Sequence, residues 1–286
     1  MQLAFLAWLQ TWRFSVLDYI FLAFTLLGLE YFYLLAISIM YWCIDRKASF
    51  RIGFIFILSM FINDTIKIFF HAPRPSGPGL QPLFSWTAGG YSFPSGHAQG
   101  AATFWGGIAR ISGKRPLIWM AAAMIFLISF SRLYLGVHYP VDVLVGIIIG
   151  LAAVWLLYHP AAWWENFLKS MTGIGLVLAS FLPLLLLVIN HESIAMKTVG
   201  ALCGFTLGHL MTERRGGLSH TAGFSKQIGK VLVGLMCTVG FYVAPKFLMP
   251  ESPWSGVVRY WLITWAATFV VPEILVRLKL AQRSLD

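Results

Sequence analysis

Long apolar runs separated by short charged loops constrain this chain more than any other feature. Val143–Tyr158, Thr172–Ile189 and Val231–Ala244 contain no charged residue at all. Only 11% of the 286 residues are charged, and the mean hydropathy is +0.76, whereas soluble domains carry about 25% charged residues. Because a helix needs about 20 apolar residues to cross a bilayer, the pattern predicts an integral membrane protein.

The apolar runs predict an all-α, polytopic membrane helix bundle. We expect about nine transmembrane helices, at residues 16–43, 50–71, 97–112, 116–137, 139–158, 172–190, 193–211, 229–248 and 254–276. The first twelve residues contain Trp8 and Trp12 and are expected to lie along the membrane interface. They also lack the basic start of a secretory signal, so we expect no cleavable signal peptide.

The positive charges fall into two sets of loops, which predicts an orientation. Fourteen of the 21 Lys and Arg residues lie in loops 44–51, 110–115, 159–171 and 211–230 and in the C-terminal tail. Apart from three residues in the motifs below, the opposite loops hold only Arg13, Lys197, Lys246 and Arg259. Because cytoplasmic loops are enriched in positive charge, we expect the first set and the C-terminus to be cytoplasmic. The dispersal of the net charge of +10 argues against a nucleic-acid partner.

Three polar motifs lie on the opposite, outer side of this predicted topology. The first is KIFFHAPRP, with Lys67 and Arg74. The second is PSGH, with Ser95, Gly96 and His97, and the third is SRLYLGVHYPVD. The last motif contributes Arg132, His138 and Asp142. Charges at membrane depth are costly and therefore usually mark a function.

These residue types together are suited to phosphoryl chemistry. Three fixed cations can hold the oxygens of a phosphate, and a glycine at a helix start lets backbone N–H groups approach an anion. Two histidines and a carboxylate can supply an acid, a nucleophile and an orienting group. No motif has a metal-ligand spacing, so we expect no metal and no cofactor. Each residue alone has a structural explanation, such as a helix cap or a snorkelling cation, but eight such positions together do not.

The pattern K-x6-RP … PSGH … SR-x5-H-x3-D resembles the signature of the type 2 phosphatidic acid phosphatase (PAP2) superfamily, which includes glucose-6-phosphatases and vanadium haloperoxidases. The resemblance covers roughly residues 16–158. It implies a catalytic membrane core at residues 1–158, followed by additional transmembrane helices of unknown role at 159–286. It also implies that His138 is a nucleophile that forms phosphohistidine, with Asp142 orienting it. His97 would be the general acid, and the implied phosphate-binding residues are Lys67, Arg74, Arg132, Ser95 and Gly96.

The resemblance leaves the substrate open. A phosphomonoester or diphosphate of a lipid is our leading expectation, with membrane lipids as the surroundings and an oligomeric state that the sequence does not give. The expected location is a bacterial cytoplasmic membrane with the site facing outside, or the lumen for an internal membrane. Nine helices would also suit a sugar-phosphate hydrolase of the glucose-6-phosphatase kind. A transporter or flippase of phosphorylated lipids, using the cations for binding only, is a third interpretation.

Overall fold

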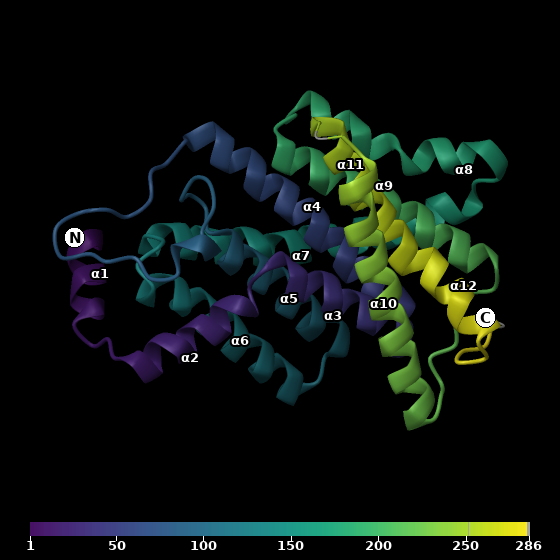
Figure 1. The fold of residues 1–286 in the computed structure, drawn as a ribbon, viewed down its shortest axis with the longest axis horizontal. Helices are drawn as coiled ribbons and strands as arrows, with labels where there is room; N and C mark the ends of the chain where they lie inside the picture. The colour runs from purple at the N-terminus through teal and green to yellow at the C-terminus, as the bar shows by residue number, and fades with distance from the viewer. Residues whose placement is uncertain (251, 285–286) are drawn as a thin grey trace. The chain divides into compact units, whose positions relative to one another are not determined.

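The computed structural model describes residues 1–250 and 252–284, and every regular element among them is helical (Figure 1). The end of the C-terminal tail, residues 285–286, lies outside this description. The elements are α1 (Gln2–Gln10), α2 (Ser15–Leu26), α3 (Glu30–Cys43), α4 (Arg46–Phe70), η1 (Ser85–Thr87), α5 (Gly96–Ser112), α6 (Arg115–Tyr134), α7 (Pro140–Ser170), α8 (Gly173–Ser180), η2 (Leu182–Val188), α9 (Ser193–Arg214), α10 (Phe224–Leu248), α11 (Pro253–Trp265), η3 (Ala266–Val270) and α12 (Val271–Arg277). The all-α membrane fold predicted from the sequence is confirmed.

The number of spans differs from the prediction. Six described helices are long and apolar enough to cross a membrane, or seven if one bent pair forms a single span; nine spans are not confirmed. The expected helix at 172–190 is instead the short α8 followed by the 3-10 helix η2. Pro183 explains the change, because a proline lacks the N–H needed by a continuing α-helix and clashes with the preceding turn.

The bent pair corrects the single helix expected at 16–43. Helices α2 and α3 meet at an angle of 54°, with Gly28 in the break between them. A Cβ atom at Gly28 would lie 2.6 Å from Cδ2 of His97 and 2.9 Å from Cγ2 of Ile128. The glycine therefore allows the broken segment to pass close to the imidazole of the PSGH motif.

Helix α7 is longer than expected. The sequence predicts a helix at 139–158 and a loop at 159–171, but α7 continues to Ser170 with Pro160 inside it. The predicted loop is therefore mostly helix. The start of α7 agrees closely with the predicted start at residue 139. Pro140 occupies the first helical position, where the missing N–H of proline costs nothing.

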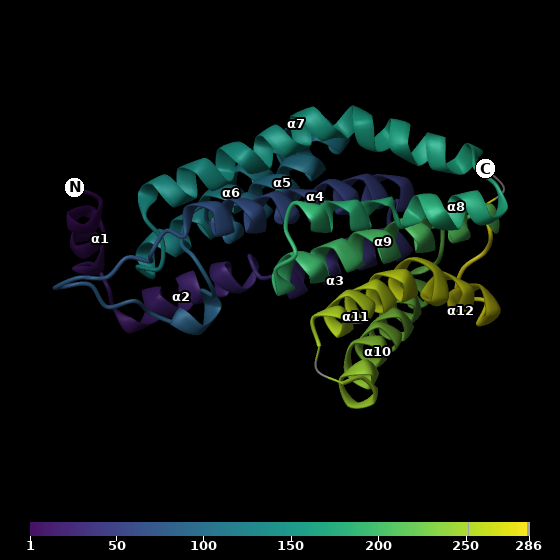
Figure 2. The same cartoon turned by 90° about the horizontal axis from the view of Figure 1, so that it is seen from above.

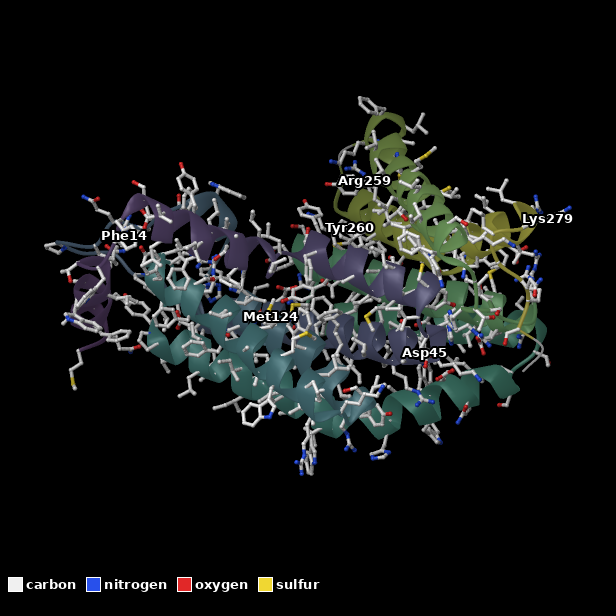
Figure 3. All side chains as sticks on the ribbon, turned by 90° about the horizontal axis from the view of Figure 1, so that it is seen from below. Phe14, Asp45, Met124, Arg259, Tyr260 and Lys279 are labelled. Carbon is white, nitrogen blue, oxygen red and sulfur yellow. The ribbon has the colours of Figure 1, made fainter. Side chains whose placement is uncertain are left out.

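The chain forms two compact units. Unit 1 contains residues 1–34 and 59–158, and unit 2 contains residues 35–58 and 159–286. The division at 158 inferred from the family resemblance stays a prediction, since these units describe packing and unit 2 includes residues 35–58. Both units expose large apolar side chains, as helices facing lipid do; Phe14 at the start of α2 is one example (Figure 3).

A seam of small residues joins α5 and α7 in unit 1, where the two helices lie side by side (Figure 1). A Cβ at Gly146 would lie 2.7 Å from the carbonyl oxygen of Ser95, and one at Gly150 would lie 2.5 Å from that of Gln99. Small residues four apart let helix backbones approach closely in membranes. The opposite face of α7 exposes Leu144 and Ile148. The seam therefore fixes the start of α5 against the start of α7.

Unit 2 uses the same device on α9. Gly200, Gly204 and Gly208 are spaced four apart, and a Cβ at any of them would clash with backbone or side-chain oxygens of α11 and η3. Figure 2 shows α9 between α8 and α11, and α9 contacts both. A glycine at every fourth position of α9 therefore allows α9 to pack closely on α11.

Candidate active site

The PSGH motif forms the start of α5. Ser95 is the N-cap residue, and its hydroxyl accepts a hydrogen bond from the backbone N–H of Ala98 at 3.5 Å. The backbone N–H of Ser95 donates to the carbonyl of Asp142 at 2.9 Å, so Ser95 ties α5 to α7. Gly96 and His97 occupy the first turn, where N–H groups have no partner within a helix and can face an anion.

His97 lies next to the broken segment between α2 and α3. Its Nε2 atom is buried and has no hydrogen-bond partner among the described residues. A buried polar atom without a partner is costly in a protein interior. Arg132, His138, Lys67 and Arg74 all interact electrostatically with this imidazole, so the structure places His97 within the predicted cluster.

The third motif brings His138 and Asp142 together at the start of α7. His138 lies just before Pro140 and is 2% exposed, and Asp142 is in the first turn. Nδ1 of His138 is 3.4 Å from Oδ2 of Asp142. That oxygen also accepts hydrogen bonds from the backbone N–H of Tyr139 at 2.9 Å and from the Ser92 hydroxyl at 2.5 Å. The carboxylate is therefore held in one position beside the imidazole.

The contacts of His138 determine its tautomer. Nη1 of Arg74 lies 3.1 Å from Nε2 of His138, and a guanidinium can only donate. Nε2 must therefore accept, which leaves the proton of the neutral ring on Nδ1, facing Asp142. This is the arrangement in which Nε2 carries the lone pair that a nucleophile needs.

The three cations share one short segment, Thr87–Tyr91. Lys67 donates to the carbonyl of Tyr91 at 2.6 Å. Arg74 donates to the carbonyls of residues 89, 90 and 91 at 2.6, 3.0 and 3.3 Å. Arg132 donates to the carbonyl of Thr87 at 3.1 Å and to its hydroxyl at 3.0 Å. All three cations therefore donate hydrogen bonds to neutral backbone and hydroxyl oxygens of this segment.

Arg132 is the most deeply placed of the three. It is 0% exposed, and its Nη1 also donates to the hydroxyl of Thr25 at 3.3 Å. Among residues 1–250 and 252–284, its Nε has no hydrogen-bond partner and no carboxylate forms a salt bridge with it. A buried charge without a counter-charge is strongly unfavourable, so this guanidinium is suited to an anion that enters the site.

The cations also set the charge state of His138. Burial lowers the pKa of His138 well below its ordinary value, and the charges of Arg132, Arg74 and Lys67 lower it further. The imidazole is therefore neutral over the physiological pH range. A neutral ring with its lone pair on Nε2, beside three cations, can attack a phosphorus atom.

Three supporting residues, Ser92, Thr87 and Thr25, were missed by the sequence analysis. Ser92 orients Asp142, and Thr87 and Thr25 hold Arg132, as described above. Asn63 donates to Gln99 Oε1 at 2.8 Å and to the carbonyl of Pro94 at 3.4 Å, and so braces the PSGH turn. Isolated hydroxyls and amides carry little signal in a sequence; only the proximity of Ser92 to PSGH could have drawn attention to it.

A second polar cluster lies in unit 2, away from these motifs in the chain. His209 and Glu213, four apart on α9, meet Glu165 of α7, with their ligand atoms within 4.8 Å of one another. Such a group could hold a metal ion. However, Glu213 pairs with Arg46, and Glu165 pairs with Arg51 at 3.3 Å. Since each carboxylate already has a cation, we assign no metal to this cluster.

Comparison with known proteins agrees with the motifs. The PAP2 superfamily profile matches residues 48–165, and the profile of the PAP2 superfamily phosphatase transmembrane extension matches residues 196–283. Sphingosine-1-phosphate phosphatase 2 of Mus musculus is 32% identical over 174 residues, which cover 59% of this chain and 49% of that protein. Undecaprenyl-diphosphatase BcrC of Bacillus subtilis is 30% identical over 115 residues, covering 40% of this chain and 58% of the relative.

The chain therefore spans about half the length of these two relatives. Among solved structures, LpxE of Aquifex aeolicus is 28% identical with a TM-score of 0.48, covering 54% of this chain and 93% of that protein. The two matching profiles describe successive parts of one kind of protein, a phosphatase domain and its membrane extension, in the same order as here. On this basis the chain belongs to the PAP2 superfamily.

Proposed function

We propose that this protein is a membrane phosphatase that removes phosphate from a phosphorylated lipid through a phosphohistidine on His138. The observation that carries the proposal is the setting of His138, with Nδ1 facing Asp142 and Nε2 beside Arg74. The names of the relatives, which are phosphatases of sphingosine phosphate and undecaprenyl diphosphate, support a lipid substrate. The orientation predicted from the loop charges would place the site on the outer side of the membrane.

In the first step, Arg74 transfers its hydrogen bond from Nε2 of His138 to a phosphoryl oxygen. The freed Nε2 attacks the phosphorus atom, forming a P–N bond as the bond to the leaving oxygen breaks. Burial and the neighbouring cations lower the pKa of His97, so its imidazole becomes protonated only when the negatively charged phosphate binds beside it. It then donates that proton to the leaving oxygen. The proton on Nδ1 of His138 stays with the ring, and Asp142 stabilises the cation that forms. Lys67, Arg74 and Arg132 neutralise the phosphoryl oxygens in the transition state.

In the second step, His97 removes a proton from water as the water attacks phosphorus. The P–N bond breaks, inorganic phosphate leaves, and both imidazoles return to their starting states. For the phosphate to bind, its oxygens must replace the carbonyls of segment Thr87–Tyr91 as partners of the cations. Such an exchange favours the anion, because a phosphate oxygen carries a negative charge and attracts each cation more strongly than a neutral carbonyl does.

The two alternatives have less support. The sugar-phosphate interpretation depended on a layout of nine helices, whereas six or seven described helices qualify as spans. The transporter interpretation requires cations for binding but gives no reason for a histidine with an oriented tautomer. A binding protein would also not need a second imidazole with an unpartnered nitrogen next to the cations.

The test is phosphate release by the purified protein from a panel of undecaprenyl diphosphate, phosphatidate, sphingosine phosphate and glucose 6-phosphate. We expect release from at least one lipid and no turnover by His138→Ala. Rapid quenching with a radiolabelled lipid phosphate should give labelled wild-type enzyme and no label on His138→Ala. A transporter would show binding without release in the wild type. Normal release by both His138→Ala and His97→Ala would refute the mechanism, and preference for glucose 6-phosphate would refute the lipid substrate.

A further inference from the structure

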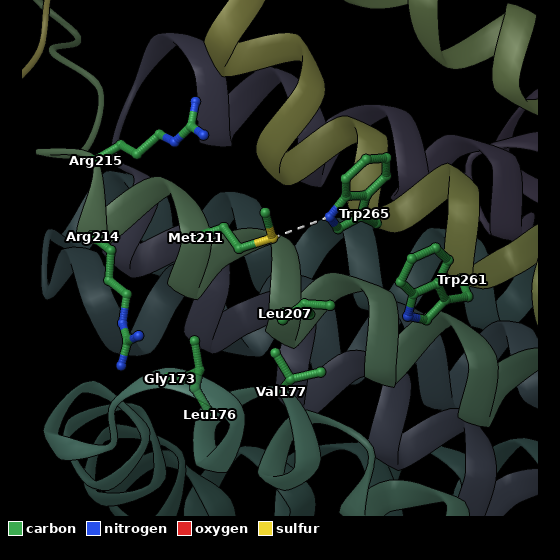
Figure 4. Close-up of a pocket in the computed structure, with 9 residues that line it drawn as sticks. All are labelled: Gly173, Leu176, Val177, Leu207, Met211, Arg214, Arg215, Trp261 and Trp265. Atoms are coloured by element: carbon green, nitrogen blue, oxygen red, sulfur yellow. Dashed lines mark hydrogen bonds between the residues drawn. The ribbon is translucent and has the colours of Figure 1, made fainter.

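Unit 2 contains a pocket of about 480 Å³ between α8, α9 and α11 (Figure 4). This volume lies in the range of about 300–1,000 Å³ typical of sites for small molecules. None of the motifs discussed above contributes to it. Its walls on α9 and α11 lie in the part of the chain that the family profile describes only as a transmembrane extension, and α8 precedes that part.

Most of the wall is apolar. Leu176 of α8 and Leu207 of α9 are 3% and 7% exposed, while Val177 is 41% exposed at the open side. Opposite them, the rings of Trp261 and Trp265 stack with centroids 5.5 Å apart and planes 7° apart. Such a surface suits a hydrocarbon chain.

The indole nitrogens of this wall are poorly satisfied. Nε1 of Trp265 donates to the thioether sulfur of Met211 at 3.4 Å, as Figure 4 shows, and a thioether is a weak acceptor. Nε1 of Trp261 has no hydrogen-bond partner among the described residues. Buried tryptophan N–H groups usually find an acceptor. A ligand with ester or phosphate oxygens would offer a stronger acceptor than sulfur.

Two arginines close one end of the pocket. Arg214 is the last residue of α9, and Arg215 follows it; Figure 4 places both at the end of the pocket away from Trp261. Arg215 pairs with Glu273 at 3.0 Å and still has a 53% exposed side chain. Within residues 1–250 and 252–284, Arg214 is exposed and forms no salt bridge.

We infer that this pocket binds an anionic phospholipid, with its phosphate against Arg214 and Arg215 and one acyl chain against the tryptophan wall. The arginines lie at the end of α9, where a spanning helix meets the headgroup region, and basic pockets between transmembrane helices bind anionic headgroups. A soluble anion would not use the apolar wall, and a purely apolar ligand would leave the arginines unused. The inference is independent of the catalytic proposal, because the pocket lies in unit 2 and the inference involves binding without a reaction.

The test measures lipid affinity of the full-length protein in a nonionic detergent. Phosphatidylglycerol and phosphatidylcholine with identical chains are titrated separately, and inorganic phosphate is a third arm. The readout is the shift of the thermal unfolding midpoint, which rises when a ligand binds the folded state. Phosphatidylglycerol is a phosphodiester, so the proposed removal of a terminal phosphate does not consume it.

We expect phosphatidylglycerol to raise the midpoint more than phosphatidylcholine does. Inorganic phosphate can also bind the cations of unit 1, so any shift that it causes should persist when Arg214 and Arg215 are replaced. The double variant Arg214→Gln/Arg215→Gln should bind phosphatidylglycerol about 25-fold more weakly, from about fivefold for each charge. Arg277→Gln removes another exposed arginine of unit 2 outside the pocket and should leave the affinity unchanged. Val177→Trp fills the open side without changing charge and should also weaken binding.

Three results would overturn the inference. Equal shifts with both lipids would indicate a general effect of lipid, and a shift with phosphate that disappears in the double arginine variant would indicate a site for a free ion. Wild-type affinity in the double arginine variant would place the phospholipid elsewhere, such as at the cations of unit 1. If that variant does not fold, Val177→Trp decides the matter, because unchanged affinity there would exclude an acyl chain from the pocket.

Discussion

Replacing Asp142 with asparagine tests the proposed nucleophile most directly. The substitution keeps the size of the side chain and an oxygen that can still accept from the Tyr139 N–H and the Ser92 hydroxyl. It removes the negative charge that lies 3.4 Å from Nδ1 of His138. In the proposed reaction this charge matters most after phosphoryl transfer begins, when the imidazole becomes a cation.

The distance gives the magnitude. Two unit charges 3.4 Å apart interact by about 5 kcal/mol at an effective dielectric constant of about 20. The amide dipole of asparagine retains part of this interaction. We therefore expect kcat to fall about 10³-fold, since each 1.36 kcal/mol of barrier corresponds to a factor of ten. KM should change little, because the three cations that bind the phosphate remain.

The assay is single-turnover release of phosphate in detergent micelles, with the thermal unfolding midpoint measured on the same samples. Ser92→Ala is the matched control, because it removes one hydrogen bond to the same carboxylate but leaves its charge. We expect kcat of Ser92→Ala to fall about tenfold. A hydrogen bond to a charged group contributes about 1.5–3 kcal/mol, and only part of that energy is expected to act in the transition state. A loss below tenfold in Asp142→Asn, with a native midpoint, would refute the assigned role of the carboxylate.

Further outcomes follow from the same geometry. Because burial and three cations lower the pKa of His138 below 6.5, the acid limb of kcat/KM due to this residue should lie below pH 6.5; a limb above pH 7 that moves in His138 variants would contradict this. For the same reason the folded protein should lose stability as pH falls below about 6.5, by about 1.4 kcal/mol per pH unit, and His138→Asn should reduce this slope in unfolding experiments. Activity should survive EDTA and be inhibited by vanadate, whose adduct on His138 would mimic the transition state; strict Mg²⁺ dependence or insensitivity to vanadate would count against the mechanism. Gly146→Val should lower the free energy of unfolding by about 1–3 kcal/mol and reduce kcat, because its Cβ would press on the Ser95 carbonyl. Gly240→Ala has open space around its Cβ and should change neither stability nor phosphate release.

The sequence predicted the cluster better than it predicted the helices around it. The three motifs combine residue types that are unfavourable in a membrane unless they act together, so their convergence could be expected. By contrast, the break at Gly28 lies inside an apolar run with no polar signal. Gly28 allows a close approach to His97, which lies 69 positions later in the chain, and such an approach cannot be read from local composition.

The spacing of the first motif shows the same limit. Seven residues make about two helical turns, but Pro73 is expected to end the helix before Arg74, and α4 does end at Phe70. Arg74 reaches the cluster because carbonyls of residues 89–91 and of Val137 accept from its guanidinium. Lys67 and Arg74 both contact the segment Thr87–Tyr91, although helix periodicity does not bring them there.

The segment Thr87–Tyr91 explains how three cations can lie together although none of them forms a salt bridge with a carboxylate among the described residues. Its carbonyls and one hydroxyl supply partial negative charge to each cation, and they do so without the full charge that would compete with a phosphate. Carboxylates in the same places would neutralise the cations permanently and exclude an anion. Gly90, with φ +62°, adopts a backbone conformation that glycine reaches without strain, so it allows consecutive carbonyls to face Arg74. The weak, replaceable partners of the cations are therefore as important to the proposed phosphate site as the cations themselves.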